Sequence, residues 1–441
     1  MTTGTRISPL LTDLYELTMA AGYWEEGKNE LATFSLFLRQ QTNRGYYVAA
    51  GLEPTIALLD QFRFTADDIA YLKELGLFKP EFLTYLENLR FQGDVRALAE
   101  GTLFFPDEPV LEVTAPLIQA QLLETCLINI VGVHTLITTK AARCVHAAKG
   151  RQLIDFGLRR TQGMDAGMAA ARSTYLAGFD ATSNVLAGKR MGIPLAGTMA
   201  HSFVQSFADE TEAFEAYARI FPENTVLLID TYDTLAGAGK AVQVARQMAL
   251  SGKRLVGVRL DSGDTASLSR QVRRLFDNAG LPDVKIFASG GFDEFKVSDA
   301  LAQDASIDAF GVGTHVGVSA DQPFLDLVYK LVRYEGRDVC KYSVGKKTVA
   351  APKQVFRFKD KAGFFLEDIV GYKGEEVTGA EKLLHPVMKD GKICRKLPSL
   401  EEIRRHFRSQ YAHLPDAYKQ LQAPPTYPVK LSDGLKARQP S

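Results

Sequence analysis

The feature that most constrains the fold is a repeating pattern between residues 150 and 330. Short apolar runs end in Asp, Gly, Ser, Arg or His, and stretches with helical periodicity lie between them. The candidate strands are Gln152–Phe156, Ile193–Met199, Thr225–Ile229, Arg254–Arg259, Val284–Ala288 and Ile307–Gly311. Thr234–Leu250 and Ala266–Asn278 are two of the helical stretches. This alternation predicts a parallel α/β sheet, either a barrel or an open doubly wound sheet.

The positions of the glycines favour the barrel. The first candidate strand is not followed by the GxGxxG sequence of a dinucleotide-binding sheet, which also disfavours a redox enzyme. Glycines instead follow the late strands, at Gly290–Gly291 and Gly311–Thr314. Phosphate sites of α/β barrels commonly follow the last strands. We therefore expect an irregular or incomplete TIM-like α/β barrel.

The segments on either side of the repeat show different secondary-structure patterns. Residues 1–148 mix helical patterns, such as Leu10–Trp24, with short strand-like runs, which is typical of an α+β domain. Residues 331–441 return to strand-like and polar segments and include a charged helix at Leu400–Gln410. We expect the C-terminal segment to pack on the N-terminal one and on a barrel of residues 149–330.

Composition excludes several classes of function. Lysines plus arginines and aspartates plus glutamates number 52 each, so the chain has no basic excess for a nucleic-acid backbone. The four cysteines form no CxxC pair, which argues against structural zinc and a secreted disulfide framework. The N-terminus lacks a secretory signal pattern, and polar residues interrupt the apolar stretch Leu117–Ile137, which predicts a buried helix. We expect a cytoplasmic protein that neither spans a membrane nor binds nucleic acid.

The residues just past the candidate strands are unusually polar, and in a barrel such residues line the active site. They are Asp155, Phe156, Arg159, His201, Asp230, Asp233, Arg259, Asp261, Ser289, Gly290, Gly291, Gly311, Gly313 and Thr314. Arginines, a serine and glycine amides supply donors that match phosphoryl oxygens, and acids beside them suggest bridging Mg²⁺. The alternatives are structural: Asp230 and Asp233 could be helix N-caps, and His201 could be a capping or core histidine.

Five segments carry a resemblance to a known family. They are Leu11–Met19 (LTDLYELTM), Asp155–Thr161 (DFGLRRT), Gly178–Val185 (GFDATSNV), Gly197–Ser202 (GTMAHS) and Lys353–Arg357 (KQVFR). With these segments the chain resembles the nicotinate phosphoribosyltransferases, a type II phosphoribosyltransferase family, over nearly its whole length. The resemblance implies that nicotinate and phosphoribosyl pyrophosphate become nicotinate mononucleotide and pyrophosphate, the first step of NAD salvage from nicotinate.

The resemblance also implies roles for individual residues. His201 matches a histidine that ATP phosphorylates, which would couple ATP hydrolysis to the transfer. Phe156 would stack on one face of the pyridine ring and Tyr15 of the partner subunit would cover the other, so the active sites of a homodimer would be shared. Arg159 and Arg259 match positions near the phosphoribosyl and base pocket. The residues that match the ribose and 5′-phosphate site are Asp261, Gly290, Gly291, Gly311 and Gly313. We further hypothesise that Asp230 or Asp233 orients the His201 imidazole.

The identity of the base remains open at this point. The nicotinamide-specific relatives use an acid at the position of Asp180, and this acid would repel the carboxylate of nicotinate. Ser183 and its neighbours, together with Arg159 or Arg160, could supply donors to that carboxylate. We expect nicotinate, with nicotinamide as the nearest alternative and quinolinate as a weaker one. A barrel that binds a sugar phosphate without turning it over is the alternative of another class.

Overall fold

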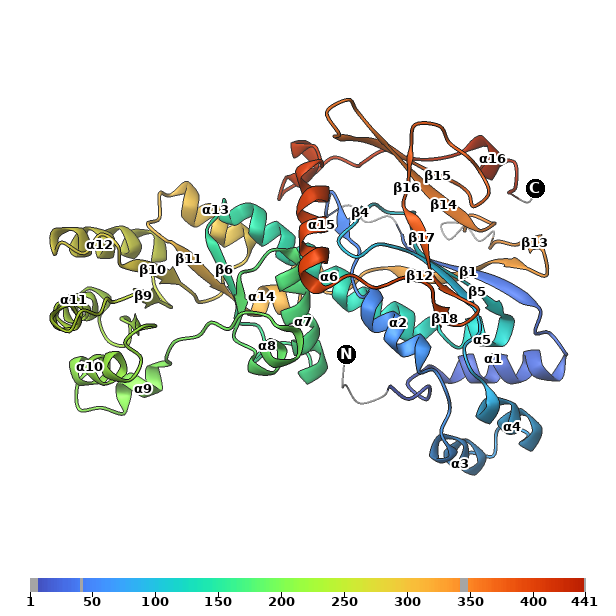
Figure 1. The fold of residues 1–441 in the computed structure, drawn as a ribbon, viewed down its shortest axis with the longest axis horizontal. Helices are drawn as coiled ribbons and strands as arrows, with labels where there is room; N and C mark the ends of the chain where they lie inside the picture. Colours follow the sequence, from blue (N-terminus) through green and yellow to red (C-terminus); the bar gives the residue numbers. More distant parts are fainter. Residues whose placement is uncertain (1–6, 40–42, 342–347, 440–441) are drawn as a thin grey trace. The chain divides into compact units, whose positions relative to one another are not determined.

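The computed structural model describes residues 7–39, 43–341 and 348–439. The chain divides into two compact units, one made of residues 1–139 and 324–441 and the other of residues 140–323 (Figure 1). The first division falls inside α6 (Glu124–Ala148). Mostly antiparallel sheets occupy the first unit and a parallel sheet occupies the second. The predicted combination of an α/β core with an α+β domain built from both terminal segments is therefore confirmed.

The first unit is built around one large sheet with the order β13-β12-β1-β5-β3-β17-β18 among its described residues. The N-terminal strands β1, β5 and β3 lie together in its middle and C-terminal strands flank them on both sides, because β12 pairs with β1 and β17 pairs with β3. The strands of this sheet are β1 (Leu31–Leu38), β3 (Asp94–Leu98), β5 (Pro109–Pro116), β12 (Leu327–Tyr334), β13 (Arg337–Asp338), β17 (Leu384–Lys389) and β18 (Lys392–Ile393). The smaller sheets contain β2 (Tyr47–Val48), β4 (Leu103–Phe104), β14 (Lys353–Lys359), β15 (Phe365–Tyr372), β16 (Glu381–Lys382) and β19 (Val429–Leu431).

Helices lie around these sheets, and several of them bury apolar side chains in a core that includes Leu36, Ile56, Val113 and Leu127. They are α1 (Leu14–Glu25), α2 (Leu52–Asp60), α3 (Ala66–Glu74), α4 (Pro80–Asn88), α5 (Leu117–Gln121), α15 (Leu400–Ala412), α16 (Asp433–Lys436) and the 3₁₀ turn Asp416–Lys419. The stretch Leu117–Ala148 is long and apolar enough to cross a membrane by composition, yet 61% of its most apolar window is buried inside the protein. This burial agrees with the expected core helix, which the structure divides into α5 and α6.

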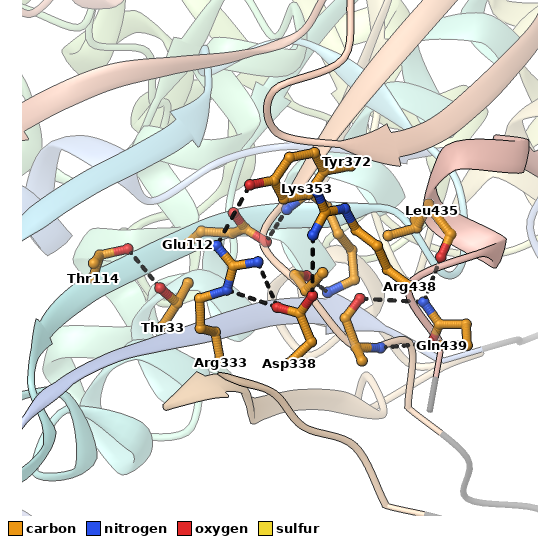
Figure 2. A network of polar contacts seen from close by, with 12 residues as sticks. Thr33, Glu112, Thr114, Arg333, Asp338, Lys353, Tyr372, Leu435, Arg438 and Gln439 are labelled. Atoms are coloured by element: carbon orange, nitrogen blue, oxygen red, sulfur yellow. Dashed lines mark hydrogen bonds and ion pairs between the residues drawn. The ribbon is translucent and has the colours of Figure 1, made fainter. Parts of the chain in front are cut away.

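Within the first unit, a polar network joins the last described residues of the chain to neighbouring strands (Figure 2). Arg333 and Arg438 both point toward the carboxylate of Asp338, and the Arg333 Nε lies 2.6 Å from it. The Arg438 guanidinium also stacks 3.8 Å from the ring centroid of Tyr372. Next to this network, burial lowers the pKa of the Lys353 amine to about 8, although the Glu112 carboxylate opposes that shift. The network joins β12, β13 and β15 to the end of the chain.

The second unit, all of whose residues are described, has a parallel sheet with the order β7-β6-β11-β10-β9-β8. Its strands are β6 (Gln152–Asp155), β7 (Ala181–Thr182), β8 (Val226–Leu228), β9 (Gly257–Leu260), β10 (Lys285–Ala288) and β11 (Ala309–Val312). The last strand, β11, pairs with the first, β6, and every other pair is consecutive in the chain. That is the order of a barrel opened between β7 and β8, so the prediction of an incomplete barrel is confirmed.

Helices cover the outer side of this sheet. Figure 1 shows β9, β10, β11 and β6 side by side, with α11, α12 and α13 outside them. The helices of the second unit are α7 (Met164–Ala177), α8 (Val185–Met191), α9 (His201–Gln205), α10 (Glu210–Ile220), α11 (Thr234–Leu250), α12 (Thr265–Asn278), α13 (Glu294–Ala302) and α14 (Thr314–Gly317). Leu227, Val258 and Ile286 are fully buried in the core between sheet and helices, which holds the carboxyl ends of the strands in fixed positions.

One predicted strand is wrong. Within Ile193–Met199 only Leu195 forms a bridge, and its partner is Thr182 of β7. Pro194 has no backbone N–H to donate, so this run cannot extend a ladder beyond that bridge. The strand that occupies the place next to β6 is β7, which is too short to give a periodic signal.

Candidate active site at the carboxyl edge of the parallel sheet

Most of the predicted site residues follow the carboxyl ends of β6, β8, β9, β10 and β11, within the second unit. Because these strands are parallel and adjacent, their carboxyl ends meet along one edge of the sheet. Ser183 directly follows β7. His201 follows the irregular run that contains Leu195. Tyr15 belongs to α1 in the first unit.

The end of β6 is fixed by a buried carboxylate. Asp155 is 2% exposed, and its two oxygens accept from the Gly157 amide at 2.8 Å and from the Thr182 hydroxyl at 2.7 Å. Burial raises the pKa of this carboxyl, although both hydrogen bonds oppose the shift. The ring of Phe156 lies against Gly311, where a Cβ atom would be 2.5 Å from two ring carbons. Gly311 thus leaves the room that the aromatic ring needs at the edge of the sheet.

His201 begins α9, and its Nδ1 lies 3.1 Å from the hydroxyl of Thr231. The hypothesis that Asp230 or Asp233 orients the imidazole is therefore wrong. Asp233 instead caps α11 by accepting from the Ala236 amide at 2.8 Å, which was the structural alternative. The hydroxyl of Thr231 fixes the ring instead, and Nε2 has no hydrogen-bond partner among the described residues.

A second acid, Asp230, organises the loop after β9. Its Oδ2 accepts from the Asp261 amide at 2.9 Å and from the Ser262 hydroxyl at 2.6 Å. Its buried Oδ1 has no partner in the described chain. Asp261 in turn accepts a short hydrogen bond from the hydroxyl of Ser289, at the end of β10. Hydrogen bonds thus connect the residues that follow β8, β9 and β10 into one continuous surface.

Arg259, at the end of β9, contacts the segment Met199–His201, here called the histidine loop. Its guanidinium donates to the Met199 carbonyl at 2.8 Å, two residues before His201. Burial lowers the pKa of Arg259, while the Asp261 and Asp230 carboxylates oppose that shift. The Nε of Arg259 is buried and has no acceptor among the described residues. Since buried donors in native proteins are nearly always paired, this atom marks a position for a ligand oxygen.

The loop after β10 presents free backbone amides. Gly290 and Gly291 have φ angles of +98° and +70°, and both are exposed. A Cβ atom on Gly290 would lie 2.1 Å from the Asp261 carbonyl oxygen, so only glycine fits there. The amides of Gly290 and Gly291 have no acceptor in the part of the chain that is described. Successive amides of this kind form an anion-binding concavity.

The loop after β11 lies close to β6. A Cβ atom on Gly313 would be 2.7 Å from the Phe156 carbonyl oxygen, and Thr314, which is exposed, begins α14. The loop is tied to the loop after β10, because the Nδ1 of His315 lies 3.4 Å from the Asp293 carboxylate. Asp293 was not predicted, although an Asp that precedes a helical pattern is an ordinary N-cap signal.

One predicted residue does not join this cluster. Asp180 precedes β7 and accepts from the Leu153 amide at 2.9 Å, at the amino side of the sheet, so its predicted place in the base pocket is not supported. Arg159 is exposed and has no ion-pair partner among the described residues, but it lies near enough to Arg259 for its charge to help lower the pKa of that guanidinium. Tyr15 is 46% exposed, and partial burial and the nearby Glu124 carboxylate raise its pKa to about 12. Ser183, by contrast, is held at the edge because its amide donates to the Asp155 carbonyl at 2.9 Å.

Comparisons with known proteins agree over the whole chain. Residues 10–132 match the N-terminal domain of nicotinate phosphoribosyltransferase, residues 151–359 match the nicotinate phosphoribosyltransferase family and residues 375–439 match the C-terminal domain. The nicotinate phosphoribosyltransferase of Mycobacterium tuberculosis is 46% identical over 434 residues, which cover 97% of this chain and 92% of the relative. That of Bacillus subtilis is 40% identical, with 96% and 93% covered.

A solved structure gives the same result. The crystal structure of human nicotinic acid phosphoribosyltransferase superposes with a TM-score of 0.87 at 32% identity, and the match covers 97% of this chain and 98% of the human one. The chain therefore belongs to the nicotinate phosphoribosyltransferase family.

Proposed function

We propose that this protein transfers the phosphoribosyl group of phosphoribosyl pyrophosphate to nicotinate, which yields nicotinate mononucleotide and pyrophosphate for NAD salvage. Family membership over the full chain supports this reaction. The observation that carries it is the set of unsatisfied donors at one edge: the buried Nε of Arg259 and the amides of Gly290 and Gly291, close in the fold to the histidine loop. These groups match phosphoryl oxygens.

The chemistry assigns a task to each kind of residue. Departure of pyrophosphate from C1 of the ribose builds positive charge on the sugar before the weak pyridine nitrogen attacks. The carboxylates of Asp230 and Asp261 would stabilise that charge, and Arg259 would hold the departing phosphates. The glycine amides after β10 would hold the 5′-phosphate. Phe156, set at the edge by Gly311, would stack on the pyridine ring.

The position of Asp180 favours nicotinate over nicotinamide. An acid in the base pocket would repel the carboxylate of nicotinate. Asp180 is instead occupied by the Leu153 amide and lies away from the carboxyl edge. Ser183 at that edge, with the exposed Arg159 and Arg160, can supply donors to a carboxylate. The objection to nicotinate that the sequence raises is thereby removed.

Magnesium is proposed as the metal of this reaction. Among the described residues no three His, Cys, Asp or Glu side chains form a metal cage. Mg²⁺ is usually held by one or two carboxylates together with substrate phosphates, so the absence of a cage fits this ion. The buried and unpartnered Oδ1 of Asp230, next to Asp261, is the oxygen that would contact it. Bound there, Mg²⁺ would stabilise the negative charge of the leaving pyrophosphate.

ATP is proposed to act through His201. Thr231 holds Nδ1, which leaves Nε2 to receive the γ-phosphoryl group as ADP departs. A phosphoryl group adds about −1.5 to −2 charge, which would reorganise Arg259 and the metal so that phosphoribosyl pyrophosphate binds more productively. Transfer of that group to water after turnover would favour product release.

A homodimer with shared active sites is also proposed. Tyr15 is exposed on α1 together with Leu14 and Met19, and Leu11 just before the helix is exposed as well. Exposed apolar residues gathered on one helix are typical of an interface. Across such an interface Tyr15 of the partner subunit would cover the face of the base that Phe156 leaves open.

The base is identified by comparing kcat/KM for nicotinate, nicotinamide and quinolinate, measured as pyrophosphate release from phosphoribosyl pyrophosphate and Mg²⁺. We expect nicotinate to be preferred by at least about 100-fold, because the arginines and the serine that would pair the substrate carboxylate lose that charge partner when the base is the neutral amide. A preference for nicotinamide would keep the fold and the mechanism but overturn the assigned substrate. No release with any base would leave a barrel that only binds a sugar phosphate.

A further inference from the structure

Lys296, in the first turn of α13, has its ammonium group at the glycine loop after β10. Its Nζ lies 3.3 Å from the position that a Cβ atom of Gly291 would occupy. Lys296 is exposed, and no carboxylate pairs with it among the described residues. An unpaired cation therefore lies beside Gly291, and the amides of Gly290 and Gly291 have no acceptor among the described residues either.

The fold holds the start of α13 rigidly. Asp293 accepts from the Lys296 amide at 3.0 Å, which fixes the turn that carries the lysine. The next residue, Glu294, is fully buried and pairs with Lys140 at 2.5 Å and Arg143 at 2.8 Å. These contacts hold the first turn of α13 in place, so the backbone of Lys296 has a defined position next to Gly291.

Lys296 also lines a cleft of about 310 Å³ with Ser262 and with two residues already assigned to the phosphoribosyl substrate, Asp261 and Gly290. Three carboxylates line the cleft as well. Asp261 is occupied by Ser289, and Asp264 caps α12 by accepting from the Ser267 amide. Asp299, one turn after Lys296, forms no ion pair with it among the described residues. The lysine is thus left available to an anion that enters the cleft.

We propose that Lys296 binds a phosphate group of the phosphoribosyl substrate over the Gly290–Gly291 loop. This assignment rests on the proposed function and adds to it a substrate-binding residue that follows no strand end. A lysine ammonium is a compact point charge with three donors, which suits a phosphate held from below by backbone amides. The Lys296 side chain then acts on substrate binding and not on the base.

The test replaces Lys296 with Met, which keeps the length of the stem and removes the charge. We expect the KM for phosphoribosyl pyrophosphate to rise about tenfold or more, the value of one charge-assisted hydrogen bond, while kcat and the KM for nicotinate change less than about twofold. Lys296→Arg restores part of the loss. Lys285→Met is the matched control, since Lys285 is an exposed lysine at the opposite, amino end of β10.

A second readout separates this assignment from the proposed reaction. Calorimetric titration with ribose 5-phosphate needs no turnover, and we expect Lys296→Met to bind it about tenfold more weakly than wild type and Lys285→Met. That result supports the proposed role of Lys296 in phosphate binding even if the enzyme turns over none of the bases. Equal binding of ribose 5-phosphate by wild type and Lys296→Met, including no measurable binding by either, overturns the proposal, as does an unchanged KM in an active enzyme. Matching thermal transitions establish that the variants are folded.

Discussion

Gly290→Ala is expected to lower kcat/KM for phosphoribosyl pyrophosphate by at least about 100-fold. The new Cβ atom would lie 2.1 Å from the Asp261 carbonyl oxygen, and neither backbone segment can accept this distance without moving. The shift would carry the amides of Gly290 and Gly291 away from the hydrogen-bonded surface formed by Asp261 and Ser289. A displacement of about 1 Å in a positioning group can cost a factor of about 100 in rate.

Gly280→Ala is the matched control for that variant. Gly280 lies between α12 and β10 with a similar φ of +76°, but no atom lies within 4 Å of its Cβ position. Both substitutions therefore carry the backbone strain of a non-glycine residue in the left-handed region, about 1–2 kcal/mol, and only Gly290→Ala adds the collision. Steady-state kinetics should show less than about a threefold change for Gly280→Ala. Equal kinetics for the two variants would contradict the assignment of this loop to the substrate.

Glu294→Gln is expected to destabilise the protein by about 3–5 kcal/mol. The carboxylate of Glu294 neutralises Lys140 and Arg143 at 2.5 and 2.8 Å, and Glu294 and Lys140 have no exposed side-chain surface. Asp321, 2.8 Å from Lys140, would remain beside that lysine, but its side chain is partly exposed. Removing one partner of a buried ion cluster leaves uncompensated charge, which is more costly than the intact cluster is stabilising.

Urea unfolding at neutral pH measures this difference. Glu223→Gln serves as the control, because Glu223 pairs with Lys253 at the surface and solvent screens that pair. We expect the control to change the free energy of unfolding by less than about 1 kcal/mol. A Glu294→Gln variant as stable as the control would show that the buried cluster does not hold the start of α13.

Much of the fold could be predicted from sequence periodicity. The helix Thr234–Leu250 has the predicted bounds, because a long amphipathic pattern ends at clear signals. β8, β9, β10 and β11 lie within two or three residues of their predicted positions. β7 could not be found, since two residues carry no period, and the apolar run around Pro194 took its place in the prediction. The break in the barrel between β7 and β8 could not be predicted, because the hydrophobic periodicity of a sequence does not show which strands pair with each other.

The site was predicted to the extent that it follows strand ends. Arg259, Asp261, Ser289 and Gly290 are connected by hydrogen bonds or close contacts along one edge, as the barrel interpretation requires. Thr231 could not be preferred over its acidic neighbours, because the choice among them depends on side-chain direction after β8. Asp180 was misplaced since the position of β7 was unknown. Lys296 lies within a helix, where no rule about strand ends applies.

The most direct test of the proposed mechanism is the effect of ATP on pyrophosphate release from phosphoribosyl pyrophosphate, Mg²⁺ and nicotinate, compared between wild type and His201→Ala. The variant removes the ring nitrogen that Thr231 leaves free and should leave the substrate groups after β9 and β10 in place. We predict that ATP stimulates release by the wild type and has no effect on His201→Ala. Equal stimulation of both proteins would contradict the role of His201, and no nicotinate-dependent release by the wild type would contradict the assigned reaction.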